Sequence, residues 1–218
     1  GKKTIRFVTM GDSQRWYDET EDFVKAINKR NDIDFVIHGG DMSDFGLTKE
    51  FLWQRDIMNG LNVPYVVLIG NHDCLGTGAE TYKAVFGPTN FSFIAGNVKF
   101  VCLNTNALEY DYSEPVPNFT FMEQEITSRL DEFEKTVISM HARPYTDVFN
   151  DNVAKVFQHY IRQYPGIQVC TAAHTHHYQD DVIFDDGIHY VTSDCMDYRT
   201  YLVFTITPEK YEYELVKY

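Results

Sequence analysis

The sequence predicts an α/β fold built around parallel β-strands. Several short apolar runs rich in β-branched residues indicate buried strands. The first few of these runs are separated by segments in which apolar residues have helical spacing. This alternation is typical of βαβ units. Because the 218 residues contain no internal repeat and no linker rich in Gly, Pro or Ser, residues 1–218 are predicted to form one domain.

The elements of the N-terminal half follow one another in a regular order. The expected strands are 4–10, 33–37 and 64–69, and the expected helices begin near Asp18, after Thr48 as N-cap, and near Glu80. Residues 91–95 and 98–103 are then expected to form a β-hairpin across Gly96-Asn97.

The C-terminal half is expected to extend the sheet structure. Pro115 and Pro117 indicate a loop before it. The expected helices are 121–133 and 153–164, and the expected strands are 136–140, 167–172, 182–184, 189–192, 201–206 and 211–216.

Charge and composition narrow the classes of function. A net charge of −13 with 44% hydrophobic residues predicts a folded, acidic globule that repels duplex nucleic acid unless positive charge gathers locally. All apolar runs are far shorter than the ~20 residues of a membrane span, so a soluble protein is expected. The four cysteines lack the paired spacing of a zinc ribbon. The compartment stays open, because the sequence does not tell whether an export signal was removed before Gly1.

Side chains that can bind metals follow five of the expected strands. The clusters are Asp12 with Gln14, Asp41 with Asp44, Asn71 with His72 and Asp73, His141, and His174 with His176. Ligand sites of α/β sheets lie beyond the carboxyl ends of the strands, so parallel strands would bring these clusters together. Residues two apart on extended chain point to the same side, so the first and last clusters could each offer two ligands to a single centre. Any one cluster could equally be a polar turn, a helix cap or a structural histidine.

The types of ligand indicate two metal ions. Carboxylates, imidazoles and amide oxygens suit manganese, iron or zinc, and seven ligands fit two ions that share a carboxylate better than one tetrahedral ion. Asp41 follows Gly39-Gly40, a turn that lets the backbone approach a cation closely. We therefore expect Asp41 to bridge the two ions and Asp44 to orient a catalytic histidine.

In this order, the five clusters resemble the sequence blocks of the calcineurin-like metallophosphoesterase superfamily. The matching segments are Gly11-Asp12-x-Gln14, Gly40-Asp41-x-x-Asp44, Gly70-Asn71-His72-Asp73, the block of His141, and Ala173-His174-x-His176. The resemblance implies a four-layer α-β-β-α sandwich of two mixed sheets flanked by helices. It also implies two metal ions as cofactors and a small-molecule phosphoester as substrate.

The resemblance implies a role for each position. The first ion would be held by Asp12, Gln14, Asp41 and His176, and the second by Asp41, Asn71, His141 and His174. His72, held by Asp44, would be the general acid for the leaving oxygen or a stabiliser of the transition state. A metal-bridging hydroxide would attack a phosphomonoester or phosphodiester in line.

Two departures from the family pattern leave an alternative open. Gln14 stands where the family usually has histidine, and an amide oxygen is a harder and weaker donor than imidazole. This change predicts weaker occupancy of the first position and a shift toward Mn²⁺ or Mg²⁺. Ala173 replaces a glycine and adds a methyl group beside the site. The second hypothesis is a metal-binding module of the same fold with little or no turnover, because Gln14 weakens the first metal site. A third, a nuclease on single strands, needs a basic groove that the net charge disfavours.

Three residues are candidate contacts for the substrate. Arg15 and Arg143 lie next to two of the blocks, where a guanidinium could grip a phosphate oxygen, and Asn71 is the third. Either arginine could equally be an ordinary surface residue. The histidines outside the blocks are expected to be structural or on the surface: His38, His159 and His189.

Overall fold

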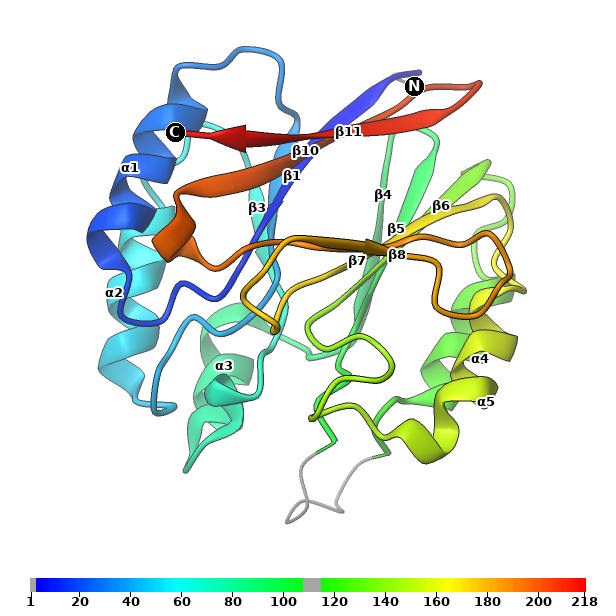
Figure 1. Cartoon of the computed structure of the whole chain (residues 1–218), viewed down its shortest axis with the longest axis horizontal. Helices are drawn as coiled ribbons and strands as arrows, with labels where there is room; N and C mark the ends of the chain where they lie inside the picture. Colours follow the sequence, from blue (N-terminus) through cyan, green and yellow to red (C-terminus); the bar gives the residue numbers. More distant parts are fainter. Residues whose placement is uncertain (1–2, 108–114) are drawn as a thin grey trace.

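The computed structural model describes residues 3–107 and 115–218, and they form two β-sheets packed face to face with helices on both outer sides (Figure 1). In spatial order, the first sheet consists of β11 (Tyr211–Lys217), β10 (Thr200–Ile206), β1 (Ile5–Met10), β2 (Phe35–His38) and β3 (Tyr65–Val67). The second consists of β4 (Phe91–Ala95), β5 (Val98–Leu103), β6 (Lys135–Met140), β7 (Ile167–Ala172), β9 (Tyr190–Thr192) and β8 (Gln179–Asp181). Gly1 and Lys2, which bear on a removed leader, lie outside the described residues.

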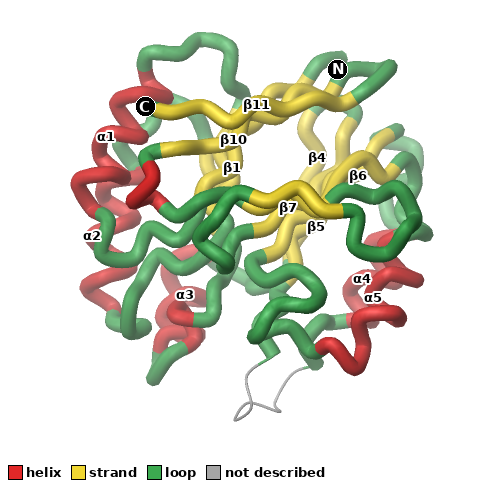
Figure 2. The backbone as a smooth tube through the Cα atoms, viewed as in Figure 1, coloured by secondary structure: helices red, strands yellow, loops and turns green. Residues whose placement is uncertain are grey.

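The helices cover the outer faces of the two sheets, as Figure 2 shows. They are α1 (Tyr17–Asn28), α2 (Thr48–Met58) and α3 (Gly78–Phe86) on one side, and α4 (Phe119–Thr127) and α5 (Ala154–Ile161) on the other. Short 3-10 turns cover His72–Cys74, Asp151–Val153 and Met196–Tyr198. Both sheets are mixed: β1, β2 and β3 are parallel, as are β5, β6, β7 and β9, whereas β4, β8, β10 and β11 run antiparallel to their neighbours. The predicted four layers are confirmed, and the single domain stays a prediction.

Three apolar clusters fill the spaces between the four layers. In the middle of the first sheet, β2 is fully buried and β1 nearly so, and alternate side chains of β1 enter different clusters: Phe7 points to the space between the sheets, whereas Val8 packs under the helices. Between the sheets, Phe7 stacks on Phe35 at 5.6 Å between ring centroids and meets Phe100 edge-on at 5.0 Å. Phe100 belongs to the second sheet, so its edge-on contact with Phe7 helps to pack the two sheets against each other.

Three local predictions are wrong in detail, each for a physical reason. Helix α2 is not capped by Thr48: the carboxylate of Glu50 accepts the backbone N–H groups of Phe45 and Leu47 at 3.0 and 3.1 Å, so the helix begins after Leu47. Helix α4 ends at Thr127 and does not reach residue 133. The buried ammonium of Lys99 takes up carbonyl oxygens at this end of the helix.

The expected strand 182–184 is also misplaced. The strand that forms is β8, which pairs with β9 and places Asp180 opposite Val191. Ile183 and Phe184 instead pack against the apolar cluster under α4 and α5. In the described part of the chain, no helix combines the length and apolar character that crossing a membrane requires.

Candidate metal centre

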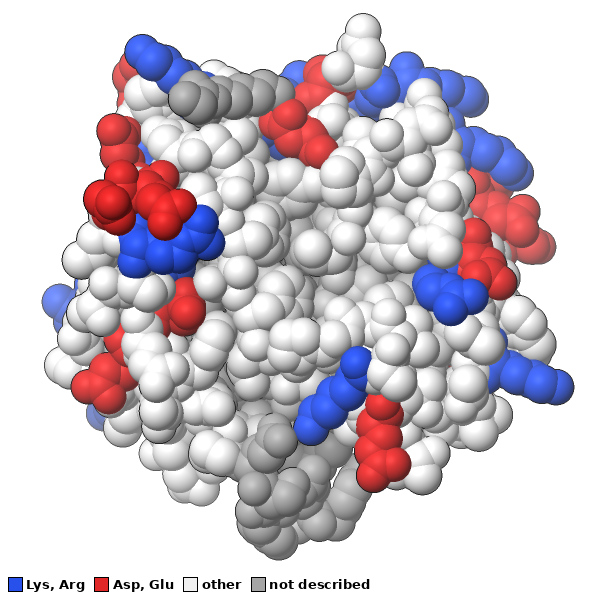
Figure 3. Space-filling view, turned by 180° about the vertical axis from the view of Figure 1, so that it is seen from behind, with Lys and Arg blue, Asp and Glu red and all other residues white. Residues whose placement is uncertain are grey.

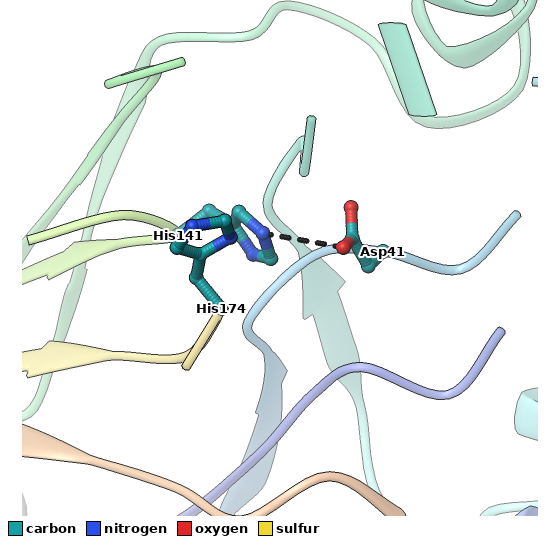
Figure 4. Close-up of side chains that lie close together, drawn as sticks. All are labelled: Asp41, His141 and His174. Carbon is teal, nitrogen blue, oxygen red and sulfur yellow. Dashed lines mark ion pairs between the residues drawn. The ribbon is translucent and has the colours of Figure 1, made fainter. Parts of the chain in front are cut away.

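The five predicted clusters meet at one edge of the paired sheets. Asp12, Asp41 and Asn71 follow β1, β2 and β3 of the first sheet, whereas His141 and His174 follow β6 and β7 of the second. Figure 4 shows Asp41 facing His141, with His174 beside the ring of His141. Parallel strands therefore bring together side chains as far apart in the chain as Asp12 and His176, which are separated by 164 positions.

One group of ligands joins the two sheets through Asp41, His141 and His174. Their ligand atoms all lie within 4.8 Å of one another. Asn71 completes the group, because its Oδ1 lies 3.1 Å from His141 Nε2 and 3.0 Å from His174 Nδ1. His141 donates its other nitrogen, Nδ1, to the carbonyl oxygen of Gly39 at 2.8 Å, so Nε2 is the nitrogen that faces the group. This is the set predicted for the second ion.

A second group shares Asp41 and consists of Asp12, Asp41 and His176. His176 Nε2 lies 3.5 Å from Asp12 Oδ1, and the side-chain amide of Gln14 lies 3.4 Å from Asp41 Oδ2. These four residues are the set predicted for the first ion. His174 and His176 therefore belong to different groups, and they do not serve a single centre as their i, i+2 spacing suggested.

The backbone at these positions is strained. Nine described non-glycine residues have a positive φ, and four of them are predicted ligands: Asp12, Asp41, His174 and His176. The expectation that Asp12 and His174 lie on extended chain is therefore wrong. Left-handed backbone at non-glycine residues is uncommon and persists where the surrounding structure enforces it, often at functional sites.

Two glycines make the close approach of the loops possible. Gly40 has a φ of +105°, and a Cβ there would lie 2.7 Å from His141 Nδ1. A Cβ at Gly70 would lie 2.0 Å from Asp41 Oδ1. Because these distances leave no room for a side chain, both glycines are needed to set the loops after β2 and β3 against each other.

The buried carboxylates at the centre raise the question of what neutralises them. Burial raises the pKa of Asp12 to about 7, with Asp41 adding to the rise against the lowering effect of His141. Burial also raises the pKa of Asp73 to about 6. Burial alone would lower the pKa of His141, but the carboxylates of Asp41 and Asp12, together with the hydrogen bond to Gly39, outweigh burial and raise that pKa to about 9. Such a cluster of acids in a buried place favours bound cations.

Orphaned oxygen atoms show that the donor set fits metal ions. Asp12 Oδ1 and Gln14 Oε1 are both buried and have no hydrogen-bond partner among the described residues. A buried acceptor left unpaired destabilises a protein by about 1–3 kcal/mol. Both atoms belong to the group predicted for the first ion, and a cation at that position would satisfy them.

His72 and Asp44 are in contact, but through different atoms from those expected. The ring nitrogen Nδ1 of His72 lies 2.8 Å from the backbone carbonyl oxygen of Asp44, whereas the nearest carboxylate oxygen is 3.7 Å away. The carboxylate of Asp44 pairs with the guanidinium of Arg15. Asp44 therefore holds His72 by its carbonyl group, and its side chain holds Arg15.

An open pocket of about 310 Å³ lies beside the first group of ligands. It is lined by Gln14, Arg15, Trp16, His72, His176, His177, Cys195, Asp197 and Tyr198. Arg143 does not line it, because its guanidinium donates to Gln179 and Asp181, both at 2.9 Å. Of the two candidate arginines, Arg15 alone borders this pocket.

Two residues that the sequence analysis named without a role in the centre shape its loops. Asp73 accepts hydrogen bonds from the backbone N–H groups of Asp41, Ser43 and Gly70, so it shapes the loops after β2 and β3. Its position in the third cluster, directly after Asn71 and His72, was the feature of the sequence that pointed to it. His38 is buried, contacts Ser13 Oγ at 2.8 Å and accepts the N–H of Gly40, which is the structural role expected of it.

Comparison with solved structures supports the fold. The chain is similar to a dimetal phosphatase from Danio rerio, with a TM-score of 0.74 and 11% identity over 98% of this chain and 97% of that one. It is similar to GAP50, the anchor in the inner membrane complex of Plasmodium, with a TM-score of 0.72 and 11% identity over 99% and 85% of the two chains. The calcineurin-like phosphoesterase YfkN from Bacillus subtilis gives a TM-score of 0.57 and 12% identity over 100% and 91%.

Comparison with protein families goes further than these structural likenesses, which at such low identity concern the fold alone. No curated protein matches the sequence significantly. The family model described as calcineurin-like phosphoesterase matches residues 5–178, which is most of the chain and includes all five clusters. This family generally consists of metal-dependent phosphoesterases, and the predicted resemblance is confirmed. The chain belongs to the calcineurin-like phosphoesterase family.

Proposed function

We propose that this protein is a dinuclear metal-dependent phosphohydrolase that acts on a small phosphomonoester or phosphodiester. The observation that carries the proposal is the pair of ligand groups that share Asp41. Asp12, Gln14, Asp41 and His176 would hold one ion, and Asp41, Asn71, His141 and His174 the other. Manganese, iron or zinc suits these donors, and the amide of Gln14 favours Mn²⁺ or Mg²⁺ at the first position.

Two bound ions would supply an activated water and a clamp for the attacking and leaving oxygens in an in-line displacement. His72 would then protonate the leaving oxygen. Its ring lies at the edge of the pocket, and Nδ1 is fixed on the carbonyl oxygen of Asp44, which leaves Nε2 to donate the proton. The backbone N–H of His72 donates to Asp41 Oδ1 at 2.9 Å, so the general acid is positioned relative to the bridging carboxylate.

Arg15 is the best-placed side chain for gripping the substrate. Its side chain is 60% exposed and borders the pocket, and its guanidinium pairs with Asp44. A guanidinium binds phosphate oxygens well, and the guanidinium of Arg15 would have to donate hydrogen bonds to both Asp44 and the substrate. Asn71 remains a proposed second contact through its amide nitrogen, since its oxygen faces His141 and His174. Arg143 is left out, because Gln179 and Asp181 hold it.

The net charge of the chain favours a small substrate over a nucleic acid, and the one face drawn in Figure 3 is consistent with this. On the face drawn in Figure 3, Lys and Arg side chains gather toward the margins, most of them beside Asp or Glu, and the centre carries neither. The net charge is −13. A nuclease needs a continuous basic path for the phosphate backbone, and this face does not provide one.

One observation favours the alternative, a metal-binding module with little turnover. Gln14 is the only predicted ligand of the first ion whose side chain carries no ionisable group. Its nitrogen, not its oxygen, faces Asp41. If this amide binds its ion too weakly, the chain would hold one ion and hydrolyse phosphoesters poorly.

A paired measurement tests the proposal. Protein purified without chelator is analysed for metal, and initial rates are recorded on an aryl phosphomonoester and an aryl phosphodiester, with Asn71→Ala as the inactive control. Two ions per chain and a rate that Asn71→Ala abolishes are expected. Two ions with no hydrolysis of either substrate would refute the hydrolase, and one ion with no hydrolysis would favour the module.

A further inference from the structure

A carboxylate outside the five clusters contacts one of the proposed ligands. Asp147 lies in the loop after β6, and its Oδ1 is 2.5 Å from His174 Nε2. His174 presents its other ring nitrogen, Nδ1, to Asn71 Oδ1 at 3.0 Å. Asp147 and the proposed second ion therefore lie against opposite nitrogens of the same imidazole, so the carboxylate acts on the ring without belonging to the ligand group.

The two histidines of this group are held in matching ways but by different acceptors. His141 donates Nδ1–H to the carbonyl oxygen of Gly39 and turns Nε2 to the group. His174 donates Nε2–H to Asp147 and turns Nδ1 to the group. Each contact selects the tautomer whose free lone pair points inward. A charged acceptor also makes the ring a stronger donor to a cation than a neutral carbonyl does.

The loop that carries Asp147 is fixed by contacts on both sides of it. Thr146 Oγ1 donates to the carbonyl oxygen of Arg143 at 2.7 Å, and the backbone N–H of Ala107 donates to the carbonyl oxygen of Val148 at 2.8 Å. Phe149 is buried and packs edge-on against Phe157 of α5 at 5.2 Å. Although the side chain of Asp147 is 84% exposed, its backbone is held in place beside His174.

We infer that Asp147 is a positioning residue that fixes the tautomer and orientation of His174 and thereby strengthens binding of the second metal ion. The inference rests on the proposed function, since it needs an ion between Asp41, Asn71, His141 and His174. It predicts that Asp147 affects one of the two ions and leaves the other alone, because His176 serves the first ion and does not touch Asp147. The loop after β6 would then serve the metal centre twice: it carries His141, and through Asp147 it orients His174.

Calorimetric titration of the metal-free full chain with Mn²⁺ tests this inference. The variants are Asp147→Ala, Asp147→Asn and Asp147→Glu, with Asp131→Ala as the matched control. Asp131 is equally an exposed acid, but it precedes β6 and so lies at the opposite end of that strand from His141. Loss of such an outer contact typically weakens metal binding about 10–100-fold. Asp147→Ala should show this loss for one ion only, Asp147→Asn a smaller loss, and Asp147→Glu partial recovery.

The outcomes separate this inference from the proposed function. Thermal unfolding of the metal-free variants should match that of the unmodified chain, because the Asp147 side chain is exposed. Two ions in the unmodified chain with unchanged binding in Asp147→Ala would overturn the inference alone, as would equal weakening of both ions or the same loss in Asp131→Ala. An unmodified chain that binds no metal would overturn the proposed function, and the inference with it.

Discussion

Replacing His72 with glutamine should remove proton donation while leaving the metal centre in place. The side chain of His72 is 35% exposed and reaches the centre only at the edge of the pocket. Its contact with Asp41 runs through the backbone N–H, which His72→Gln keeps. Metal content and the temperature of unfolding should therefore stay at the values of the unmodified chain.

The expected loss of rate follows from the role of a general acid. Proton transfer by a positioned side chain contributes about 10²- to 10⁴-fold, which corresponds to about 3–5 kcal/mol of transition-state stabilisation. The loss should depend on the leaving group. An aryl phosphate whose phenol is acidic leaves with little help, whereas an alkyl phosphate needs the proton, so His72→Gln should damage the alkyl substrate more.

The assay compares kcat/KM for an aryl and an alkyl phosphoester in the unmodified chain, His72→Gln and His159→Gln. His159 is an exposed histidine on α5 and serves as the control for loss of an imidazole. Equal losses on both substrates, or a loss that accompanies a fall in metal content, would show that His72 is not the general acid.

Three other variants test the local chemistry. Asp44→Ala removes the carboxylate that pairs with Arg15 but keeps the carbonyl that holds His72, so steady-state rates should fall less than about fivefold; a loss as large as that of His72→Gln would contradict this. Phe100→Ala should lower the free energy of unfolding by about 3–5 kcal/mol in urea titration, because the ring is fully buried between the sheets; Phe45→Ala, at an exposed ring, is its control. Glu125→Gln should destabilise the chain by about 1–3 kcal/mol, because it leaves the buried ammonium of Lys99 with neutral partners only. Burial raises the pKa of Glu125, but hydrogen bonds from Ser92 and Lys99 outweigh this effect and hold the pKa below its ordinary value. The stabilisation by the ion pair is therefore present above about pH 4.3 and is lost as the pH falls through the lowered pKa of Glu125 in the folded chain. A difference in stability between Glu125→Gln and the unmodified chain that persists in acid would refute the ion pair.

The positions of the strand ends were predictable because apolar residues recur with different spacing in strands and in helices. Short apolar runs such as 4–10 and 167–172 are typical of strands in a sheet covered on both faces, and polar residues directly after such strands lie at the edge of the sheet. The hairpin across Gly96-Asn97 was likewise visible in the chain and forms as β4 and β5. The sequence thus indicated which residues gather, while the four layers came from resemblance to a family.

Details that depend on tertiary contacts were not predictable. The end of α4 depends on Lys99, which comes from β5 and takes up carbonyl oxygens of Glu125 and Ser128. Arg15, which contacts Asp44, has a positive φ. The residue type at position 15 does not predict this backbone conformation. Asp147 gave no signal either, because only the path of the loop after β6 places it beside His174.

The number of metal ions bound by the unmodified chain and by Asp41→Ala tests the central claim most directly. Asp41 is buried, belongs to both ligand groups and is the one residue that joins them. Metal analysis after equilibration with Mn²⁺ should give two ions per chain in the unmodified protein, and Asp41→Ala should lose both. An unmodified chain that holds a single ion, or an Asp41→Ala variant that still holds two, would contradict a centre built on a shared carboxylate.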